Sequence, residues 1–270
     1  MRSADASRPR YAIASHNLHR YLTETGAAVE NYEPLADPEL YLRFAEIDSD
    51  ELLLKFANTQ GWLLEPTDLD GAWCEPLSTW HFQINKCRAV LDTLELLDAW
   101  ASNDEGNDRG AAMRALAGRI RWSTVGAETD GRPGNLEKTP REKARRLAVY
   151  EYQGFKQFIR PLTPGVQFIP GDVVEPARAF VAQVINWELR GRASIAIHAG
   201  ANGALEQRIA PSNLLGAIWL QAFQQATKRT RVRRCDICRK RMDITEHRRN
   251  KTVHTSCSLR RRMAKYRERK

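Results

Sequence analysis

Residues 77–100 read LSTWHFQINKCRAVLDTLELLDAW and form the most regular stretch of this 270-residue sequence. Apolar side chains recur there at alternating steps of three and four residues, which places them on one face of an α-helix. These residues are Leu77, Trp80, Ile84, Cys87, Leu91 and Leu94. At the standard rise, such a helix is about 36 Å long. The stripe therefore predicts a long helix that packs in a core or forms a helical dimer seam.

Local signals predict further helices on both sides of this stretch. Asp48 and Ser49 form a start signal and Gly61 a stop signal for a short helix between them. Other helical segments are expected at 109–121, 141–160, 175–190 and 213–226. Helices therefore dominate the prediction for this part of the chain.

Three parts of the chain depart from the helical pattern. Residues 1–36 have weak periodicity and several turn formers, so we expect them to be largely irregular. The segment 123–140 is rich in turn residues and predicts an internal loop. Segments 193–197 and 205–209 flank a glycine-containing connection, which predicts a small β-hairpin.

Charge divides the chain into two parts. Residues 228–270 hold 18 Lys and Arg against four acidic side chains, a net charge of +14, whereas residues 1–227 carry a net charge of −5. Such asymmetry indicates a dedicated module for nucleic acid or another anionic surface. The expected fold is therefore mainly α. A helical body over 1–227, with one small hairpin, precedes a zinc-ribbon or treble-clef-like module over 228–270.

The basic segment also holds three of the five cysteines. Cys235 and Cys238 are separated by two residues, His254 and Cys257 by two, and the pairs by 15. Two such pairs can surround one ion as a tetrahedron, and three thiolates with one imidazole suit structural zinc. We therefore expect Zn²⁺ at these four residues. His247 lies between the pairs and is an alternative to His254 as the fourth ligand.

The remaining cysteines and the N-terminus bear on the compartment. Cys74 and Cys87 stand alone in apolar surroundings and are predicted to be small buried side chains. An odd number of cysteines does not fit a secreted disulfide framework. The first ten residues are not followed by an apolar signal region, and no stretch approaches 18 uncharged apolar residues. A cytoplasmic protein without a membrane span is therefore expected.

Basic side chains surround the predicted metal site. The expected phosphate contacts are Arg233, Arg234, Arg239, Lys240, Arg241, Arg248, Arg249, Arg260, Arg261, Arg262, Lys265 and Arg267. In the helix after Cys257, we expect the apolar stripe of Leu259, Met263 and Tyr266 to pack on the metal-binding turn. The predicted partner is nucleic acid, DNA more than RNA. The helical body is expected to act as a sensing domain or to form a homodimer.

The C-terminal part resembles a known family. An apolar helix at 213–220, CDIC at 235–238, CS at 257–258 and an Arg-rich terminal helix make it similar to bacterial CGNR-type zinc-finger proteins. The resemblance covers about the last 60 residues. It implies a helical domain followed by a zinc finger, in a stress-linked transcription regulator. Where that family has a fourth cysteine, this chain has RRR at 260–262, so metal binding depends on His254.

A second hypothesis is enzymatic. Arg249 and His254 match the short Arg-x4-6-His pattern of HEPN-type ribonucleases, in which His transfers a proton and Arg stabilises charge. A metal-bound imidazole nitrogen cannot transfer the same proton, so the two predictions for His254 exclude each other. The common phosphate-loop, dinucleotide, serine-hydrolase and metalloprotease motifs are missing from the sequence. We therefore expect a non-enzymatic nucleic-acid-binding protein, with an RNA-cleaving effector and a module for an acidic protein partner as alternatives.

Overall fold

The structure is a computed structural model. It describes residues 11–16, 19–24, 34–69, 72–101, 108–125, 145–199, 204–227, 230, 232–245 and 252–268. The chain divides into two compact units, which are described separately. The first unit combines Met1–Arg88 with Glu188–Lys270, and the second is Ala89–Trp187.

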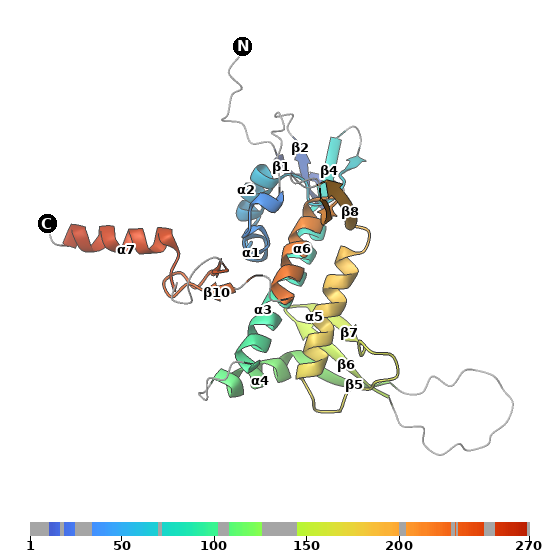
Figure 1. The fold of residues 1–270 in the computed structure, drawn as a ribbon. Helices are drawn as coiled ribbons and strands as arrows, with labels where there is room; N and C mark the ends of the chain where they lie inside the picture. The colour runs from blue at the N-terminus through green and yellow to red at the C-terminus, as the bar shows by residue number, and fades with distance from the viewer. Residues whose placement is uncertain are drawn as a thin grey trace, which may run out of the picture. The chain divides into compact units, whose positions relative to one another are not determined.

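The prediction of a mainly α fold is wrong. Among the described residues, seven α-helices accompany eleven β-strands, and the strands form four small antiparallel sheets (Figure 1). The fold is therefore a mixture of helices and antiparallel strands. All the described strands that sequence analysis missed are three to eight residues long, too short for an apolar alternation to stand out.

The first unit begins with a sheet in a region predicted to be irregular. Strands β1 (Tyr11–His16) and β2 (His19–Glu24) form a hairpin, and β4 (Ala72–Pro76) and β3 (Thr67–Leu69) complete the order β1-β2-β4-β3. Each of the first two strands contributes one fully buried side chain, Tyr11 and Leu22. One buried residue per strand is a weak periodic signal, which explains why the hairpin was missed.

Most of the helices predicted for the first unit are present. The helix α2 (Asp50–Gln60) begins where the Leu52 N–H donates to the Ser49 side chain, and it ends at Gly61, whose φ of 91° favours glycine. The helix α6 (Leu214–Ala226) is capped in the same way by Asn213. Both boundaries were set by local capping chemistry. A short 3-10 helix η1 (Pro34–Ala36) and the helix α1 (Leu40–Ala45) had not been predicted.

The long apolar stripe is core. The helix α3 (Leu77–Ala101) contains the whole predicted segment, and the side chains of the stripe are at most 6% exposed. Around Trp80, the rings of Phe44 and Phe56 lie with centroids 6.3 and 6.4 Å away. A surface seam between helices of two copies would leave these side chains exposed in one copy. The stripe therefore supports the fold and does not form a dimer interface.

The second unit corrects another helix prediction. It contains α3 from Ala89 onward, then α4 (Asp108–Arg119), β5 (Ile120–Val125), β6 (Arg145–Tyr152), β7 (Phe155–Ile159) and α5 (Val174–Leu189) as far as Trp187. The segment 141–160, predicted to be helical, forms the β6–β7 hairpin because Gln153 and Gly154 both adopt positive φ, 47° and 79°. The predicted loop at 123–140 begins with the end of β5, and residues 126–144 lie outside the described residues.

The remaining elements belong to the first unit. The predicted hairpin is confirmed as β8 (Ala193–Ala199) and β9 (Leu205–Pro211). The basic segment forms a second hairpin, β10 (Val232–Arg234) and β11 (Arg241–Asp243), followed by the helix α7 (Thr255–Glu268). In the part of the chain that the structure describes, none of the helices has the length and apolar character needed to cross a membrane.

Candidate metal centre

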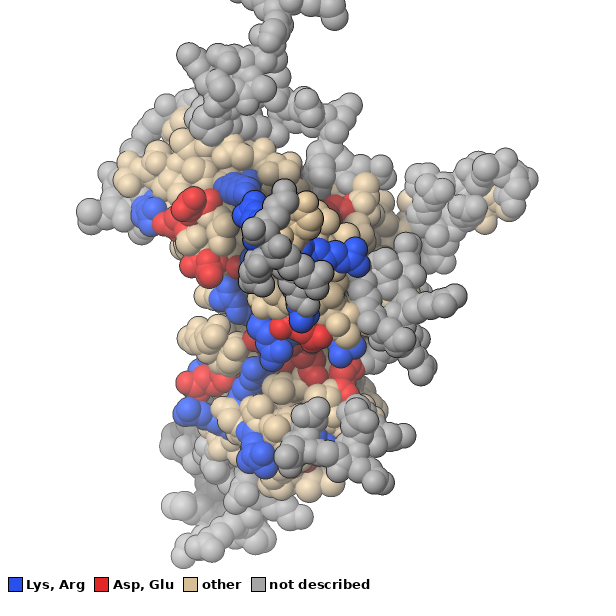
Figure 2. Space-filling view, turned by 90° about the vertical axis from the view of Figure 1, so that its left-hand side faces the viewer, with Lys and Arg blue, Asp and Glu red and all other residues tan. Residues whose placement is uncertain are grey.

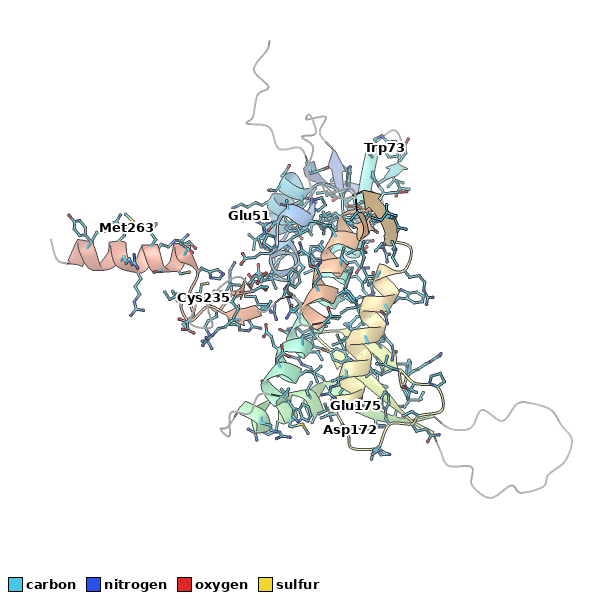
Figure 3. All side chains as sticks on the ribbon, in the orientation of Figure 1. Glu51, Trp73, Asp172, Glu175, Cys235 and Met263 are labelled. Atoms are coloured by element: carbon cyan, nitrogen blue, oxygen red, sulfur yellow. The ribbon has the colours of Figure 1, made fainter. Side chains whose placement is uncertain are left out.

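Four side chains of the basic segment meet at one point. Cys235 and Cys238 lie in the turn between β10 and β11, His254 directly precedes α7, and Cys257 lies in its first turn. Their ligand atoms all lie within 4.8 Å of one another, and Figure 3 marks the position of Cys235. Ligands of a tetrahedral zinc ion lie about 3.5–3.8 Å apart, given bonds of 2.0–2.3 Å. The predicted metal-binding residues are therefore brought together at a spacing that suits an ion such as zinc.

The backbone of the β10–β11 turn sets the positions of the two thiols. The N–H of Cys235 donates to the carbonyl of Lys240 at 2.8 Å, and the N–H of Arg239 donates to the carbonyl of Cys235 at 2.9 Å. Arg239 adopts a left-handed φ of 61°, which lets the chain reverse directly after Cys238. The N–H of Asp236 donates to the carbonyl of Thr252 at 2.9 Å. This hydrogen bond joins the β10–β11 turn to the segment that leads into α7.

The orientation of His254 identifies its ligand atom. Its Nε2 lies 3.2 Å from the Arg241 carbonyl oxygen, and its Nδ1 lies 3.4 Å from Cys238 Sγ. A carbonyl can only accept, so Nε2 carries the hydrogen and Nδ1 presents its lone pair to the cluster. His254 therefore fits the role of fourth ligand. His247, the alternative, lies outside the described residues.

The thiols differ in how readily they ionise. Burial opposes ionisation of Cys235, but backbone N–H groups of Cys238, His254 and Ile237 and the His254 side chain lower the pKa of its thiol to about 6. The pKa of Cys257 is raised, first by burial and then by the neighbouring Cys238 and Cys235. Several thiols cannot ionise side by side without a cation. The pattern fits a site in which a bound divalent cation stabilises the additional thiolates.

The donor set also limits the chemistry of the site. Three sulfurs and one imidazole complete a tetrahedron, so a zinc ion bound by all four has no open position for water or substrate. Both nitrogens of His254 are engaged, one with the cluster and one with Arg241. Arg249, its partner in the ribonuclease hypothesis, lies outside the described residues. The geometry therefore favours a structural site over a catalytic one.

Most of the predicted phosphate contacts whose side chains are described lie on the surface. Arg233, Arg234, Arg239, Lys240, Arg260, Arg261, Arg262 and Arg267 are exposed. Arg241 is only 5% exposed and is not available to a phosphate. The side chain of Lys265, and both Arg248 and Arg249, lie outside the described residues. Figure 2 shows Lys and Arg beside Asp and Glu on the face that it presents.

The apolar stripe of α7 does not pack on the metal-binding turn, contrary to expectation. Leu259, Met263 and Tyr266 are 59%, 53% and 62% exposed. Leu259 follows Cys257 by two positions, which is about 200° around a helix. With Cys257 turned toward the cluster, the stripe necessarily lies on the opposite side of α7. The small module thus lacks the apolar support that the sequence pattern had indicated.

Two acidic side chains that flank α1 support the metal-bearing hairpin instead, and sequence analysis did not identify them. Glu46 Oε1 accepts the N–H of Arg241 at 2.8 Å, and Glu39 Oε1 accepts the N–H of Asp243 at 3.1 Å. Met242 between them is fully buried. The two glutamates therefore hold the outer edge of β11 against α1. No local motif marks them, because almost 200 residues separate them from β11.

Comparisons of the chain with family models, with curated proteins and with solved structures found no match.

Proposed function

We propose that this chain is a zinc-containing nucleic-acid-binding protein. Its C-terminal module, 228–270, contacts phosphates through arginines that a bound Zn²⁺ holds in place. The resemblance to CGNR-type zinc-finger proteins extends the proposal to a transcription regulator acting on duplex DNA. The free thiols, which include all five cysteines, suit the reducing conditions of the cytoplasm.

The observation that carries the proposal is the position of the exposed basic side chains relative to the metal cluster. Arg239 and Lys240 follow Cys238 directly, and Arg260, Arg261 and Arg262 follow Cys257 by three to five residues, within about one and a half helical turns. All five side chains are exposed. A metal that joins the turn to α7 would therefore present two groups of cations on one small unit. Arranged cations of this kind bind phosphates and release the counterions of the nucleic acid.

The electrostatics favour nucleic acid over a protein partner. The net charge of +14 over 43 residues comes from 18 basic side chains, 13 of them arginine, against four acidic ones. Arg presents a planar fork of donors that matches phosphate oxygens in two-point contacts, and it remains charged at any physiological pH. An acidic protein segment offers fewer regularly spaced anions than a phosphate backbone. The excess of arginine over lysine therefore supports nucleic acid as the partner.

A salt series with the full chain tests the proposal. Binding to duplex DNA, single-stranded DNA and RNA is measured by fluorescence anisotropy in zinc-containing buffer. If about six phosphates are contacted, the logarithm of the association constant falls with log salt at a slope near −5. Binding that is independent of salt contradicts phosphate contact, and equal affinity for all three nucleic acids contradicts a DNA regulator.

Variants separate phosphate contact from other causes of weak binding. Arg260→Gln with Arg261→Gln is expected to reduce the steepness of the salt slope by about 2, because each lost contact removes about one unit. Lys55→Gln, an exposed cation of α2, is the matched control and leaves the slope unchanged. The same preparations, with His254→Ala, are incubated with RNA. If the wild type cleaves RNA while His254→Ala, with its zinc retained, does not, the proposal is contradicted. That result favours the ribonuclease alternative.

A further inference from the structure

The β8–β9 hairpin carries an apolar face on the protein surface. In the antiparallel pair, Ile195 lies opposite Ile209 and Ala193 opposite Pro211. Side chains alternate between the faces of a strand, so these residues share one face with Ile197 and Leu205. Ala199 and Gln207 belong to the same face by register, and their side chains lie outside the described ones. Ile195, Ile197 and Leu205 are 70%, 71% and 77% exposed. Three large aliphatic side chains thus stand in solvent on one small sheet.

The arrangement of this hairpin is the reverse of the usual one. Antiparallel strands with one solvated face normally place polar residues there. On the described part of this face, none of the side chains is ionisable, and Ala193, Ile209 and Pro211 extend the apolar surface beside the three exposed residues. The exposed polar residue Ser194 lies on the opposite face. Contiguous apolar surface of this kind marks an interaction site.

We infer that this face, defined by Ala193, Ile195, Ile197, Leu205, Ile209 and Pro211, is a homodimer interface that packs on the same face of a second copy. A two-fold interface must be complementary to itself, because each patch meets its own copy. The described side chains of this face satisfy that condition, since they bring no like charges together. The basic C-terminal segment is not complementary to itself, because two copies with a net charge of +14 repel each other.

The size of the face predicts how strongly the copies associate. An Ile or Leu side chain removes roughly 60–120 Å² of apolar area from water when it is buried. At 70–77% exposure the three side chains then contribute roughly 130–260 Å² per copy, below the value of about 800 Å² per partner of a stable complex. Adding Ala193, Ile209 and Pro211 brings the interface into the range of weak, transient complexes. The dimer is therefore reversible, with a dissociation constant in the micromolar range or weaker.

This interface differs from the helical seam that the sequence predicted. The stripe of α3 is buried within one copy and cannot serve as a seam. The hairpin face depends on neither zinc nor nucleic acid. The inference is therefore independent of the proposed function.

Sedimentation velocity of the nucleic-acid-free full chain tests the inference. The mean mass of the wild type should rise from 30.8 kDa toward twice that value as concentration increases through and beyond the micromolar range. Salt up to about 0.5 M should not weaken the dimer, because the face is uncharged. Ile197→Asp, and separately Leu205→Asp, should weaken association at least about tenfold, since each places a charge in an apolar interface.

Ser194→Asp is the matched control, because it adds the same charge to the opposite face of the same strand. It should leave the dissociation constant unchanged. Circular dichroism checks that each variant is folded. Because the two face variants lie in different strands, one of them still tests the interface if the other misfolds. A wild type that stays at 30.8 kDa throughout overturns the inference. A dimer that resists both face variants, or that Ser194→Asp weakens equally, overturns it as well.

Discussion

The His254 side chain and the Arg241 backbone are directly linked, since Nε2 of the imidazole lies 3.2 Å from the Arg241 carbonyl oxygen. The N–H of the same Arg241 donates to Glu46 at the end of α1 at 2.8 Å. One residue of β11 therefore connects a candidate metal ligand to a helix nearly 200 positions away in the sequence. This link predicts that the metal site and the attachment of β11 to α1 affect each other.

The first prediction concerns the metal ligand. His254→Ala should lower zinc affinity by about 100-fold, taking one of four ligands as a quarter of the 10–16 kcal/mol typical of structural zinc sites. The measurement is competition with a chromogenic chelator. His81→Ala removes an exposed imidazole that contacts Asp50 at 3.1 Å, and it should leave zinc affinity unchanged. Full zinc affinity in His254→Ala would exclude this residue as a ligand.

The second prediction concerns the glutamates of α1. Glu46→Ala removes the acceptor of the Arg241 N–H and should destabilise the local structure by about 1 kcal/mol, since a typical hydrogen bond contributes that much. Amide exchange at Arg241, followed by NMR or mass spectrometry, should then accelerate about fivefold. The N–H of Asp243, bound by Glu39, should respond less. Glu65→Ala, which removes an exposed acidic side chain, is the control. If it accelerates exchange at Arg241 as much as Glu46→Ala does, a specific link between Glu46 and Arg241 is contradicted.

A third prediction follows from a buried ion pair. Lys86 Nζ lies 2.6 Å from Glu188 Oε1, and the two side chains are 9% and 2% exposed. Lys86→Met should lower the free energy of unfolding by about 3 kcal/mol, because among the described residues it leaves the buried carboxylate with Arg192 as its remaining charged partner. The measurement is urea denaturation. Lys86→Met combined with Glu188→Met should recover part of the loss, because no buried charge is then unpaired.

An exposed pair provides the comparison for that experiment. Arg178 and Glu175 lie 2.6 Å apart, with side chains about half exposed. Arg178→Met should cost less than about 1 kcal/mol, as exposed ion pairs contribute little in water. Equal losses in Lys86→Met and Arg178→Met would show that burial does not govern the first effect.

The fourth prediction concerns pH. Burial raises the pKa of Glu75 above its ordinary value of 4.5, although N–H groups of Leu64, Leu63 and Trp80 bind the carboxylate and lower the pKa. The folded state then binds more protons than the unfolded state between the two pKa values. The contribution of Glu75 to stability therefore decreases as pH rises from 4.5 through the raised pKa.

Glu75→Gln checks this sign because it removes the titration. The free energy of unfolding of the wild type minus that of the variant should fall as pH increases above 4.5. The slope can reach about 1.4 kcal/mol per pH unit for one proton. Denaturation at a series of pH values measures the difference, and a difference that grows with pH would contradict the direction of the shift.

Sequence patterns predicted those elements whose determinants are close together in the chain. Ser49 and Gly61 bound α2 through contacts within one turn, and the stripe of α3 repeats over about five turns. The first hairpin was missed because its burial depends on distant partners. Leu22 of β2, for example, pairs with Glu75 of β4. Only the folded chain creates the buried surface that such strands need.

The same distinction applies to the metal centre. The spacing of Cys235, Cys238 and Cys257 marked three ligands, because thiols two residues apart can reach one ion in any suitable turn. The spacing left two histidines as candidates. Among the described residues His254 joins the cluster, oriented by the Arg241 carbonyl, and no local pattern contains that contact.

The sequence by itself determined the three cysteine ligands of the centre and left two histidines as candidates for the fourth. It also determined the charge excess around the centre and the capped helices. Each of these depends on residues within a few turns or on composition. Tertiary structure alone decided the mixed fold, the attachment of β11 to Glu39 and Glu46, and the exposure of the apolar faces of α7 and the β8–β9 hairpin. Contacts between segments far apart in the sequence determine which apolar side chains become buried. The spacing of apolar residues along the chain does not determine whether another segment covers them.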